Sequence, residues 1–355
     1  MSHDRAATTD DRRPEQPSLL AALDVGGTKI AGGLVGPDGE LLHRVQLPTP
    51  AREGAEAVLA TVHRVLDLVA EHPLAATARA VGIGSAGPVD IRRGTVSPVN
   101  IPGWRDFPLR DAVAEHPGVK GRPVVLGGDA VAMAAAEHWR GAARPYRNAL
   151  CIVVSTGVGA GLILDGRLHT GPTGNAGHLG HITVDLDGRP CPCGSRGCIE
   201  GLASGTAIAR AAREAGWRPA GAGSPASTEG TGGTGGPADA SAAAVAEAAR
   251  AGDPIARQAF DGAARALAAG IAATATLVEI EAAVVGGGVA QAGELFFEPL
   301  RRHLADYAAL PFAAGVTVLP ARLGTDAGLV GAAALALDAL PTDAPSTDAL
   351  PTGGR

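Results

Sequence analysis

A cluster of potential metal ligands between residues 177 and 200 constrains the fold of this chain more than any other sequence feature. The segment reads GHLGHITVDLDGRPCPCGSRGCIE and holds three of the four cysteines of the chain. Three thiolates and one imidazole form the closed tetrahedral set that structural zinc sites use. Gly194 and Gly197 allow the backbone to fold tightly around an ion. The spacing predicts a zinc site with the ligands His181, Cys191, Cys193 and Cys198.

Disulfide bonds are the alternative interpretation of these cysteines. A bridge between Cys191 and Cys193 would close too short a loop, and four cysteines in 355 residues are few for a secreted, disulfide-stabilised chain. Because structural zinc sites leave no open coordination position, we expect the metal to shape a loop rather than to react. That loop presents His178, His181 and Glu200 as candidate binding residues.

Length and composition favour two domains with an aliphatic core. The chain has 355 residues, of which 46% are hydrophobic and only 3% aromatic, so the core must consist of Ala, Val, Leu and Ile. The net charge of −6 argues against a nucleic-acid surface. No apolar stretch reaches the roughly 18 residues that a membrane span needs, and the polar N-terminus does not read as a secretory signal. We expect a cytoplasmic protein without nucleic-acid or membrane partners.

The order of the apolar segments predicts a mixed α/β fold built from two related lobes. Residues 19–24, 29–35 and 40–47 read as three consecutive strands, and a helical pattern over residues 54–70 follows them. A strand, a Gly/Thr turn and a further strand begin again at residue 150, and a long helical pattern covers residues 254–278. Strands that alternate with helices in this way favour an α/β architecture.

The same pattern predicts where the lobes begin and end. We expect a small N-terminal lobe over residues 18–128 and a large C-terminal lobe over residues 129–338, which contains the metal-binding loop 177–200. Three polar or Gly/Pro-rich segments have too little apolar content to pack against a core. We expect disorder or flexibility in these segments: residues 1–17, 219–240 and 339–355.

A glycine-rich turn after the first strand is a candidate phosphate site. It places a carboxylate beside free backbone amides, a hydroxyl and an ammonium group, which together can wrap phosphate oxygens and orient a hydrated magnesium ion. An ordinary hairpin turn is the alternative. The turn does not match a Walker A motif or a Rossmann fingerprint, because it leads into a strand rather than a helix. The candidate residues are Asp24, Gly26, Gly27, Thr28 and Lys29.

A second Gly/Thr turn, at residues 155–161, repeats this chemistry in the second lobe. Two such turns in equivalent positions indicate a nucleotide held across a cleft, with one turn on each side of its phosphates. A third glycine run follows the apolar strand at residues 282–285 and would let the backbone pass close to a base or ribose, although a tight strand-to-helix turn explains it equally well. The candidates in these two segments are Thr156, Gly157, Gly159, Gly286, Gly287 and Gly288.

Asp129 is the candidate catalytic base. Phosphoryl transfer to an alcohol needs a group that accepts the proton of the hydroxyl. Asp129 follows a predicted strand, precedes a predicted helix and lies at the predicted lobe boundary, where a base would face the cleft. A helix N-cap is the alternative role, since Asp is among the residues preferred there.

Together these motifs resemble those of the ROK family of sugar kinases and related repressors, over residues 18–338. Residues 24–29 are similar to the family's first phosphate turn, residues 155–161 to its second, and residues 285–289 to its nucleotide loop. The most specific similarity joins residues 177–200 to the family's zinc signature. The resemblance implies an actin-like ATPase (ribonuclease H-like) fold, a homodimer, and phosphoryl transfer from ATP with Mg²⁺ to a hexose hydroxyl, usually O6.

The resemblance also implies roles for individual residues. Asp129 matches the catalytic base, and Glu200 matches a ligand of a sugar hydroxyl. Gly87 lies in the loop that packs against the sugar, and His178 is a further candidate sugar ligand. His181 is both a candidate sugar contact and, with Cys191, Cys193 and Cys198, an implied zinc ligand.

Two departures from the family pattern bear on the substrate. The chain has Gly128 before Asp129 where the family usually has Asn, and His178 where it usually has Glu. Neutral histidine offers one donor and one acceptor, whereas an ionised glutamate only accepts. The Gly-His-x-Gly-His variant is similar to that of bacterial N-acetylmannosamine kinases, and an acetamido carbonyl is a candidate partner for an imidazole donor. We therefore favour an N-acylhexosamine such as N-acetylmannosamine over glucose.

A non-catalytic, sugar-responsive regulator is the alternative function. ROK repressors carry an N-terminal helix-turn-helix domain, whereas only 17 residues precede the first predicted strand here. That length and the acidic net charge argue against DNA binding. Because Asp24, Asp129 and both phosphate turns are present, we expect an ATP-dependent sugar kinase.

Overall fold

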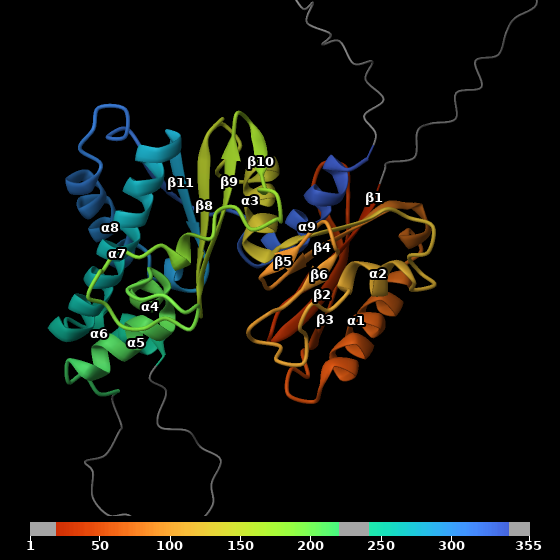
Figure 1. Ribbon diagram of the computed structural model, residues 1–355, viewed down its shortest axis with the longest axis horizontal. Helices are drawn as coiled ribbons and strands as arrows, with labels where there is room; N and C mark the ends of the chain where they lie inside the picture. The colour runs from red at the N-terminus through yellow and green to blue at the C-terminus, as the bar shows by residue number, and fades with distance from the viewer. Residues whose placement is uncertain (1–18, 220–240, 341–355) are drawn as a thin grey trace, which may run out of the picture.

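Two five-stranded sheets organise the molecule, and Figure 1 shows them side by side, each with its own helices. The computed structural model describes residues 19–219 and 241–340. The predicted tail 1–17 lies outside the described residues, as do nearly all of the predicted insertion 219–240 and tail 339–355.

Both sheets have the same strand order and the same strand directions. In each, the first three strands form an antiparallel meander, and the fourth and fifth strands run parallel to the first. The first sheet has the order β3 (Leu41–Pro48), β2 (Lys29–Val35), β1 (Leu19–Val25), β4 (Ala78–Ser85) and β7 (Val124–Gly128). The second has the order β10 (Arg167–His169), β9 (Val158–Leu164), β8 (Ala149–Val154), β11 (Ala282–Gly286) and β12 (Thr317–Pro320). The predicted repeat of strand, turn and strand is therefore present in both sheets.

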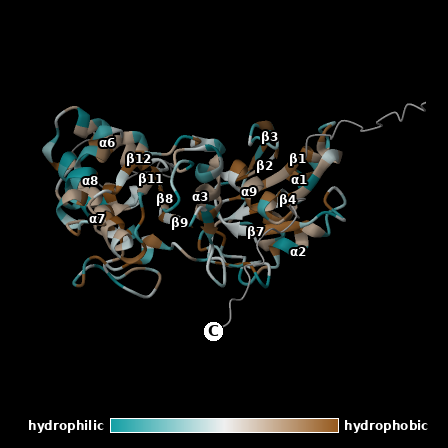
Figure 2. Ribbon diagram, turned by 90° about the horizontal axis from the view of Figure 1, so that it is seen from above, coloured by the Kyte–Doolittle hydropathy of each residue, from teal (hydrophilic) through white to brown (hydrophobic). Residues whose placement is uncertain are grey.

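Helices cover the faces of these two sheets. The described helices are α1 (Ala55–Ala70), α2 (Leu109–Ala114), α3 (Asp129–Arg140), α4 (Glu200–Ala203), α5 (Gly205–Glu214), α6 (Ala242–Arg250), α7 (Pro254–Val278), α8 (Glu294–Tyr307) and α9 (Ala327–Asp338). The small helices α5 and α6 pack on α7. A small hairpin of β5 (Val89–Asp90) and β6 (Thr95–Val96) follows β4. Figure 2 shows hydrophilic residues on the outer helices α6 and α8. Among the described helices, none is long and apolar enough to cross a bilayer.

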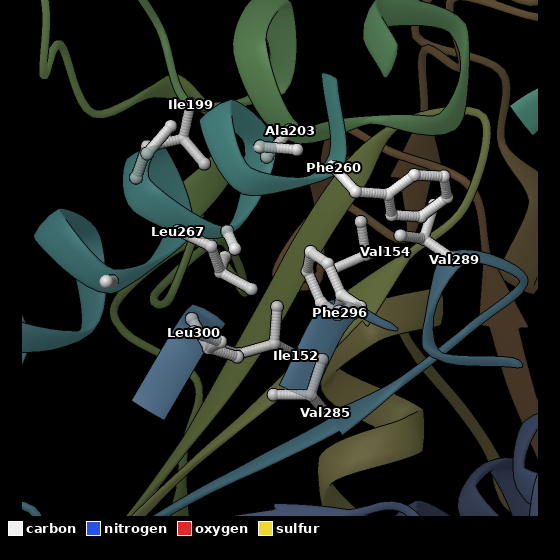
Figure 3. Packing of buried hydrophobic residues seen from close by; sticks show 14 of the residues in the cluster. Ile152, Val154, Ile199, Ala203, Phe260, Leu267, Val285, Val289, Phe296 and Leu300 are labelled. Carbon is white, nitrogen blue, oxygen red and sulfur yellow. The ribbon is translucent and has the colours of Figure 1, made fainter. Parts of the chain in front are cut away.

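Aliphatic side chains form most of the core of the second lobe, as the composition predicts, although aromatic side chains such as Phe260 and Phe296 are also buried there. Ile152 on β8 and Val285 on β11 pack beneath α7 and α8, which contribute Leu267 and Leu300 (Figure 3). Local signals set the long helix α7, because Asp253 caps its first turn by accepting a hydrogen bond from the Ala256 N–H (2.9 Å). The predicted helix over residues 254–278 is confirmed, whereas the short helices α2 and α6 were not predicted.

The helices α3 and α9 lie between the two sheets and pack against each other. α3 covers β8 and β9, and α9 covers β1 and β4. The predicted large lobe includes residues 327–338. In the structure, however, Leu329, Ala332 and Ala336 of α9 pack in a core cluster with residues of the first sheet. The chain therefore crosses between the lobes a second time, after β12.

Glycines permit the close approach of α9 to its neighbours. A Cβ at Gly82 of β4 would overlap the carbonyl oxygen of Ala332, and a Cβ at Gly331 would overlap the carbonyl oxygen of Ala132 on α3. Both obstacles are backbone atoms, so a change of side-chain rotamer cannot relieve them. The junction of the lobes thus depends on the absence of two side chains.

Gly82→Ala should destabilise the protein by about 3 kcal/mol, because the added methyl group forces α9 away from β4. The free energy of unfolding, measured by urea denaturation, tests this expectation. Gly262→Ala is the matched control, since Gly262 lies in α7 with no atom within 4 Å of its Cβ position; this variant should gain about 1 kcal/mol from helix propensity. Equal stability of the two variants would contradict the proposed packing constraint.

Candidate active site and metal centre

The first glycine turn joins β1 to β2 and faces the junction of the lobes. The Gly26 N–H donates to the carbonyl of Lys29 (3.0 Å), and the Thr49 hydroxyl donates to the carbonyl of Gly26 (2.7 Å). A Cβ at Gly27 would overlap the side chain of Asn100. The turn connects two strands of a hairpin, in agreement with the alternative interpretation. Asp24 lies directly before it, near the end of β1. Asn100 is not among the residues predicted from the sequence, because its segment contains no recognisable motif.

Asp24 and Asp129 form a pair of interacting carboxyl groups. The pKa of Asp24 is raised from 3.8 to about 6. Burial is the main cause and the charge of Asp129 adds to it, while Lys29 and Arg44 lower the pKa. Burial also raises the pKa of Asp129, while the hydrogen bond from the Ala130 N–H (2.7 Å) and the charge of His178 lower it. The two predicted residues therefore lie in one electrostatic environment, although they come from different elements.

Asp129 is the first residue of α3, and Gly128 occupies the N-cap position. The alternative role of Asp129 as N-cap is therefore wrong. Asp129 is exposed at the surface of the site although protein atoms surround its carboxyl group closely enough to raise its pKa. At Gly128 a Cβ would meet only a methyl group of Val131, at 3.9 Å. The position has room for a side chain that this chain lacks.

The second turn and the third glycine run lie against each other in the second lobe. A Cβ at Gly287 would overlap the carbonyl oxygen of Val154, and the Cβ position of Gly288 lies 3.8 Å from the Ser155 hydroxyl. Glu200, the first residue of α4, accepts a hydrogen bond from the Val158 N–H (2.9 Å), so one of its oxygens is engaged with the second turn.

The second turn is shorter than predicted, because β9 already begins at Val158. Gly159 therefore lies within the strand, where its Cβ position is 2.8 Å from the methyl group of Ala130 on α3. The absence of a side chain at Gly159 accommodates that helix next to Asp129. A phosphate contact from Gly159 stays a prediction, whereas Thr156 and Gly157 lie in the turn itself.

The four predicted metal ligands come together. The candidate ligand atoms of His181, Cys191, Cys193 and Cys198 all lie within 4.8 Å of one another. The sulfurs of Cys193 and Cys198 are 3.8 Å apart, which fits two thiolates held about 2.3 Å from one tetrahedral zinc ion. This separation is far too long for a bond between sulfurs, and all four cysteines of the chain are free, so the disulfide alternative is wrong.

Glycine conformations build the metal-binding loop. Gly194 and Gly197 have φ angles of 96° and 59°, in the left-handed region that favours glycine. A Cβ at Gly197 would in addition overlap the carbonyl of Asp185. The predicted role of these two glycines in folding the backbone around the ligands is confirmed.

His178 and Gly87 face each other across the lobes. The Nε2 atom of His178 lies 3.9 Å from the Cβ position of Gly87, and its Nδ1 atom lies 2.9 Å from the carbonyl oxygen of Asn175. The structure thus brings Gly87, Asp24, Asp129 and His178 to one region. Asn175 was missed in the sequence because its contacts are with residues far away along the chain.

The comparisons with known proteins agree with this arrangement. Residues 20–339 match the ROK family. A glucokinase of Thermotoga maritima is 36% identical over 89% of this chain and 96% of its own length. An N-acetylmannosamine kinase of Escherichia fergusonii is also 36% identical, over 89% of this chain and 97% of its own length.

Solved structures show the same fold. A ROK family glucokinase from Streptomyces griseus, determined with glucose and AMPPNP, is 37% identical with a TM-score of 0.75, covering 90% of this chain and 100% of that chain. A ROK hexokinase from Thermus thermophilus is 37% identical with a TM-score of 0.72, covering 90% of this chain and 98% of that chain. The chain belongs to the ROK family, and the predicted actin-like ATPase fold is confirmed.

The raised pKa of Asp24 predicts a specific pH dependence of stability. Because the folded protein binds this proton more tightly than the unfolded chain does, the free energy of unfolding should fall as the pH rises from about 4 to 6. Asp24→Asn should reduce this loss, leaving the part that is due to Asp129, and should melt a few degrees above the wild type at pH 8. Thermal unfolding at pH 5 and pH 8 measures the effect.

Asp306→Asn is the matched control for this experiment. Asp306 is exposed on α8, so its replacement should leave the difference between the two pH values unchanged. A wild-type pH dependence in Asp24→Asn would show that this carboxyl group is not the source.

Proposed function

We propose that this chain transfers the γ-phosphoryl group of ATP to a hydroxyl group, O6, of a hexose or N-acylhexosamine. The relatives confirm the predicted class of enzyme, an ATP-dependent sugar kinase. The observation that carries the proposal is the pair Asp24 and Asp129 at the junction of the lobes. Two glycine turns, one from each lobe, flank this pair.

Asp129 is the proposed base. Its raised pKa brings its basicity closer to what proton transfer from an alcohol at neutral pH requires. Asp24, whose pKa is about 6, is the proposed carboxylate of a magnesium site, and the ion neutralises phosphate charge when it is bound. Because the two carboxyl groups have different neighbours, Asp129 can accept the proton while Asp24 binds the metal ion.

Backbone amides are the proposed phosphate contacts. In the first lobe the turn offers Gly26, Gly27 and Thr28, with Lys29 as a nearby cation; in the second lobe the turn offers Thr156 and Gly157. The segment formed by Gly286, Gly287 and Gly288 lies against Val154 and Ser155 and is proposed to pass under the ribose or base. Backbone amides in such turns form concave sites for anions.

Zinc is the proposed occupant of the four-ligand cluster. Its chemistry is structural, since four protein ligands close the coordination shell. The ion would fix the loop that carries His178, His181 and Glu200, which we propose as sugar contacts together with Gly87. A homodimer, which the family resemblance implies, stays a prediction.

The identity of the sugar rests on positions 128 and 178. Glucokinases and N-acetylmannosamine kinases are similarly close relatives, so overall similarity does not separate the two substrates. We retain the N-acylhexosamine class as the first expectation and glucose as the second. The open space at Gly128 supports this order, because a bulkier substituent on the sugar can occupy it.

A non-catalytic regulator remains the second candidate. A ROK family transcriptional regulator related to an Escherichia coli protein is 26% identical with a TM-score of 0.72, and the match covers 90% of this chain and 78% of that chain. The presence of Asp24, Asp129 and both glycine turns favours the kinase.

Asp129→Asn should reduce turnover by at least about a hundredfold, since it removes the proposed base while keeping the size of the side chain. The assay is ADP release with glucose, mannose, fructose, N-acetylglucosamine and N-acetylmannosamine. Calorimetry should show that the variant still binds the sugar that the wild type phosphorylates. Turnover near the wild-type rate would remove Asp129 from this role, and no ADP release by the wild type with any sugar would favour the regulator.

Cys193→Ser should lose bound zinc and raise the sugar KM, because the loop is then held by three ligands at most. Metal analysis of the purified protein should find one zinc ion per wild-type chain. Cys151→Ala is the control: Cys151 is buried in β8, outside the ligand cluster, so this variant should keep its zinc. Wild-type protein purified without zinc would contradict the assignment.

A further inference from the structure

A segment of the second lobe is attached to the first lobe through Asn175. The side-chain oxygen of Asn175 accepts a hydrogen bond from the Val89 N–H (3.2 Å), and its side-chain nitrogen donates to the Val89 carbonyl (2.6 Å). Two residues away, the Ile91 N–H donates to the carbonyl of Thr173 (3.1 Å). One amide group thus satisfies both backbone groups of Val89, which lies two residues after Gly87.

The contact is close as well as polar. Gly174 has a φ angle of 92°, and a Cβ there would overlap the side chain of Ile91. Asn175 also donates to the hydroxyl of Thr173 (3.1 Å). The Val89 carbonyl fixes the orientation of the amide, because a carbonyl can only accept and only the amide nitrogen can donate. The position of Asn175 relative to the first lobe is therefore defined by several independent contacts.

The backbone carbonyl of Asn175 fixes the hydrogen-bonding state of His178. The Nδ1 atom of His178 lies 2.9 Å from this oxygen, and a carbonyl oxygen can only accept. Nδ1 must therefore carry the hydrogen, and in the neutral ring Nε2 then holds a free lone pair. His178 is exposed, and Nε2 lies on the side of Gly87, 3.9 Å from its Cβ position.

We propose that Asn175 is a positioning residue that fixes His178 as a hydrogen-bond acceptor, so that the site selects a sugar substituent that donates. Such substituents are a hydroxyl group or the N–H of an acylamino group, and a carbonyl oxygen is not one of them. This inference rests on the proposed function, because it assigns the polarity of the proposed sugar site. It reverses the polarity that the sequence suggested, in which the imidazole donates to an acetamido carbonyl.

A neutral imidazole at position 178 places an acceptor beside the acidic groups of the site without adding a negative charge. Burial raises the pKa of both Asp24 and Asp129, and the charge of Asp129 adds to the rise at Asp24. A glutamate at position 178 would offer the same acceptor polarity but would add a third negative charge. A neutral imidazole with its lone pair on Nε2 provides the acceptor without that charge.

Nitrogen-15 NMR of the histidine-labelled full-length protein tests the tautomer without any activity assay. The spectrum should show a protonated Nδ1 and an unprotonated Nε2 for His178, identified as the ring whose signals are missing in His178→Gln. A protonated Nε2 at neutral pH, in the other neutral tautomer or in a doubly protonated ring, would overturn the proposal. Because the measurement needs no turnover, its outcome is independent of whether the proposed kinase activity is correct.

Steady-state kinetics test the role of Asn175, with the sugar that the wild type phosphorylates. Asn175→Ala should raise the sugar KM about tenfold, the factor of one lost hydrogen bond, and leave the ATP KM unchanged. Asn148→Ala is the matched control, because it also removes a bond between an asparagine side chain and a backbone N–H (Asp165 N, 2.8 Å). Unchanged sugar KM in Asn175→Ala, or an equal rise in Asn148→Ala, would contradict the role.

Substrate analogues distinguish an acceptor from a donor at Nε2. At each ring position, the deoxy analogue of the accepted sugar is compared with its deoxyfluoro analogue, in which fluorine cannot donate a hydrogen bond. If Nε2 accepts, one position should lose affinity about tenfold in both analogues, and His178→Gln should reduce this loss. Recovery of affinity by the deoxyfluoro analogue at that position would show that His178 donates.

Discussion

The close backbone packing of α9 against its neighbours sets the distance between the two acidic groups of the site. A Cβ at Gly328 in the first turn of α9 would overlap the carboxyl group of Asp24, and one at Gly331 would overlap the backbone of α3. Asp129 is the first residue of α3. α9 therefore contacts Asp24 directly and supports Asp129 through α3. The geometry of the acidic pair depends on two positions of α9, Gly328 and Gly331, that carry no side chain.

A buried carboxylate holds the other side of this junction. Glu137 of α3 is fully buried and accepts hydrogen bonds from the N–H groups of Ala142 (2.7 Å), Arg322 (2.9 Å) and Leu323 (2.9 Å). Three donors compensate the cost of burying the charge. They join the end of α3 to the segment that enters α9, so both crossings between the lobes meet at one side chain.

Features that depend on local pattern were predictable from the sequence. The spacing of Cys191, Cys193 and Cys198 identified the metal cluster, and apolar periodicity identified α7 over residues 254–278. The packing of individual helices and strands against distant segments was not predictable. Nothing in the sequence of α9 indicates that it packs on the first sheet, and Gly159 reads as part of a phosphate turn although it lies within β9.

The proposed sugar contacts and the proposed phosphate contacts are held in place by different parts of the structure. His178 lies between the metal cluster that begins at His181 and the contact of Asn175 with Val89, whereas the phosphate turns follow β1 and β8 in the two sheets. If His178 contacts the sugar as proposed, a substitution in the segment 175–178 alters that contact without moving the backbone amides of the turns. Such a separation explains how relatives named for different sugars can be equally similar to this chain, at 36% identity. The choice of sugar would then depend on a few residues of one loop.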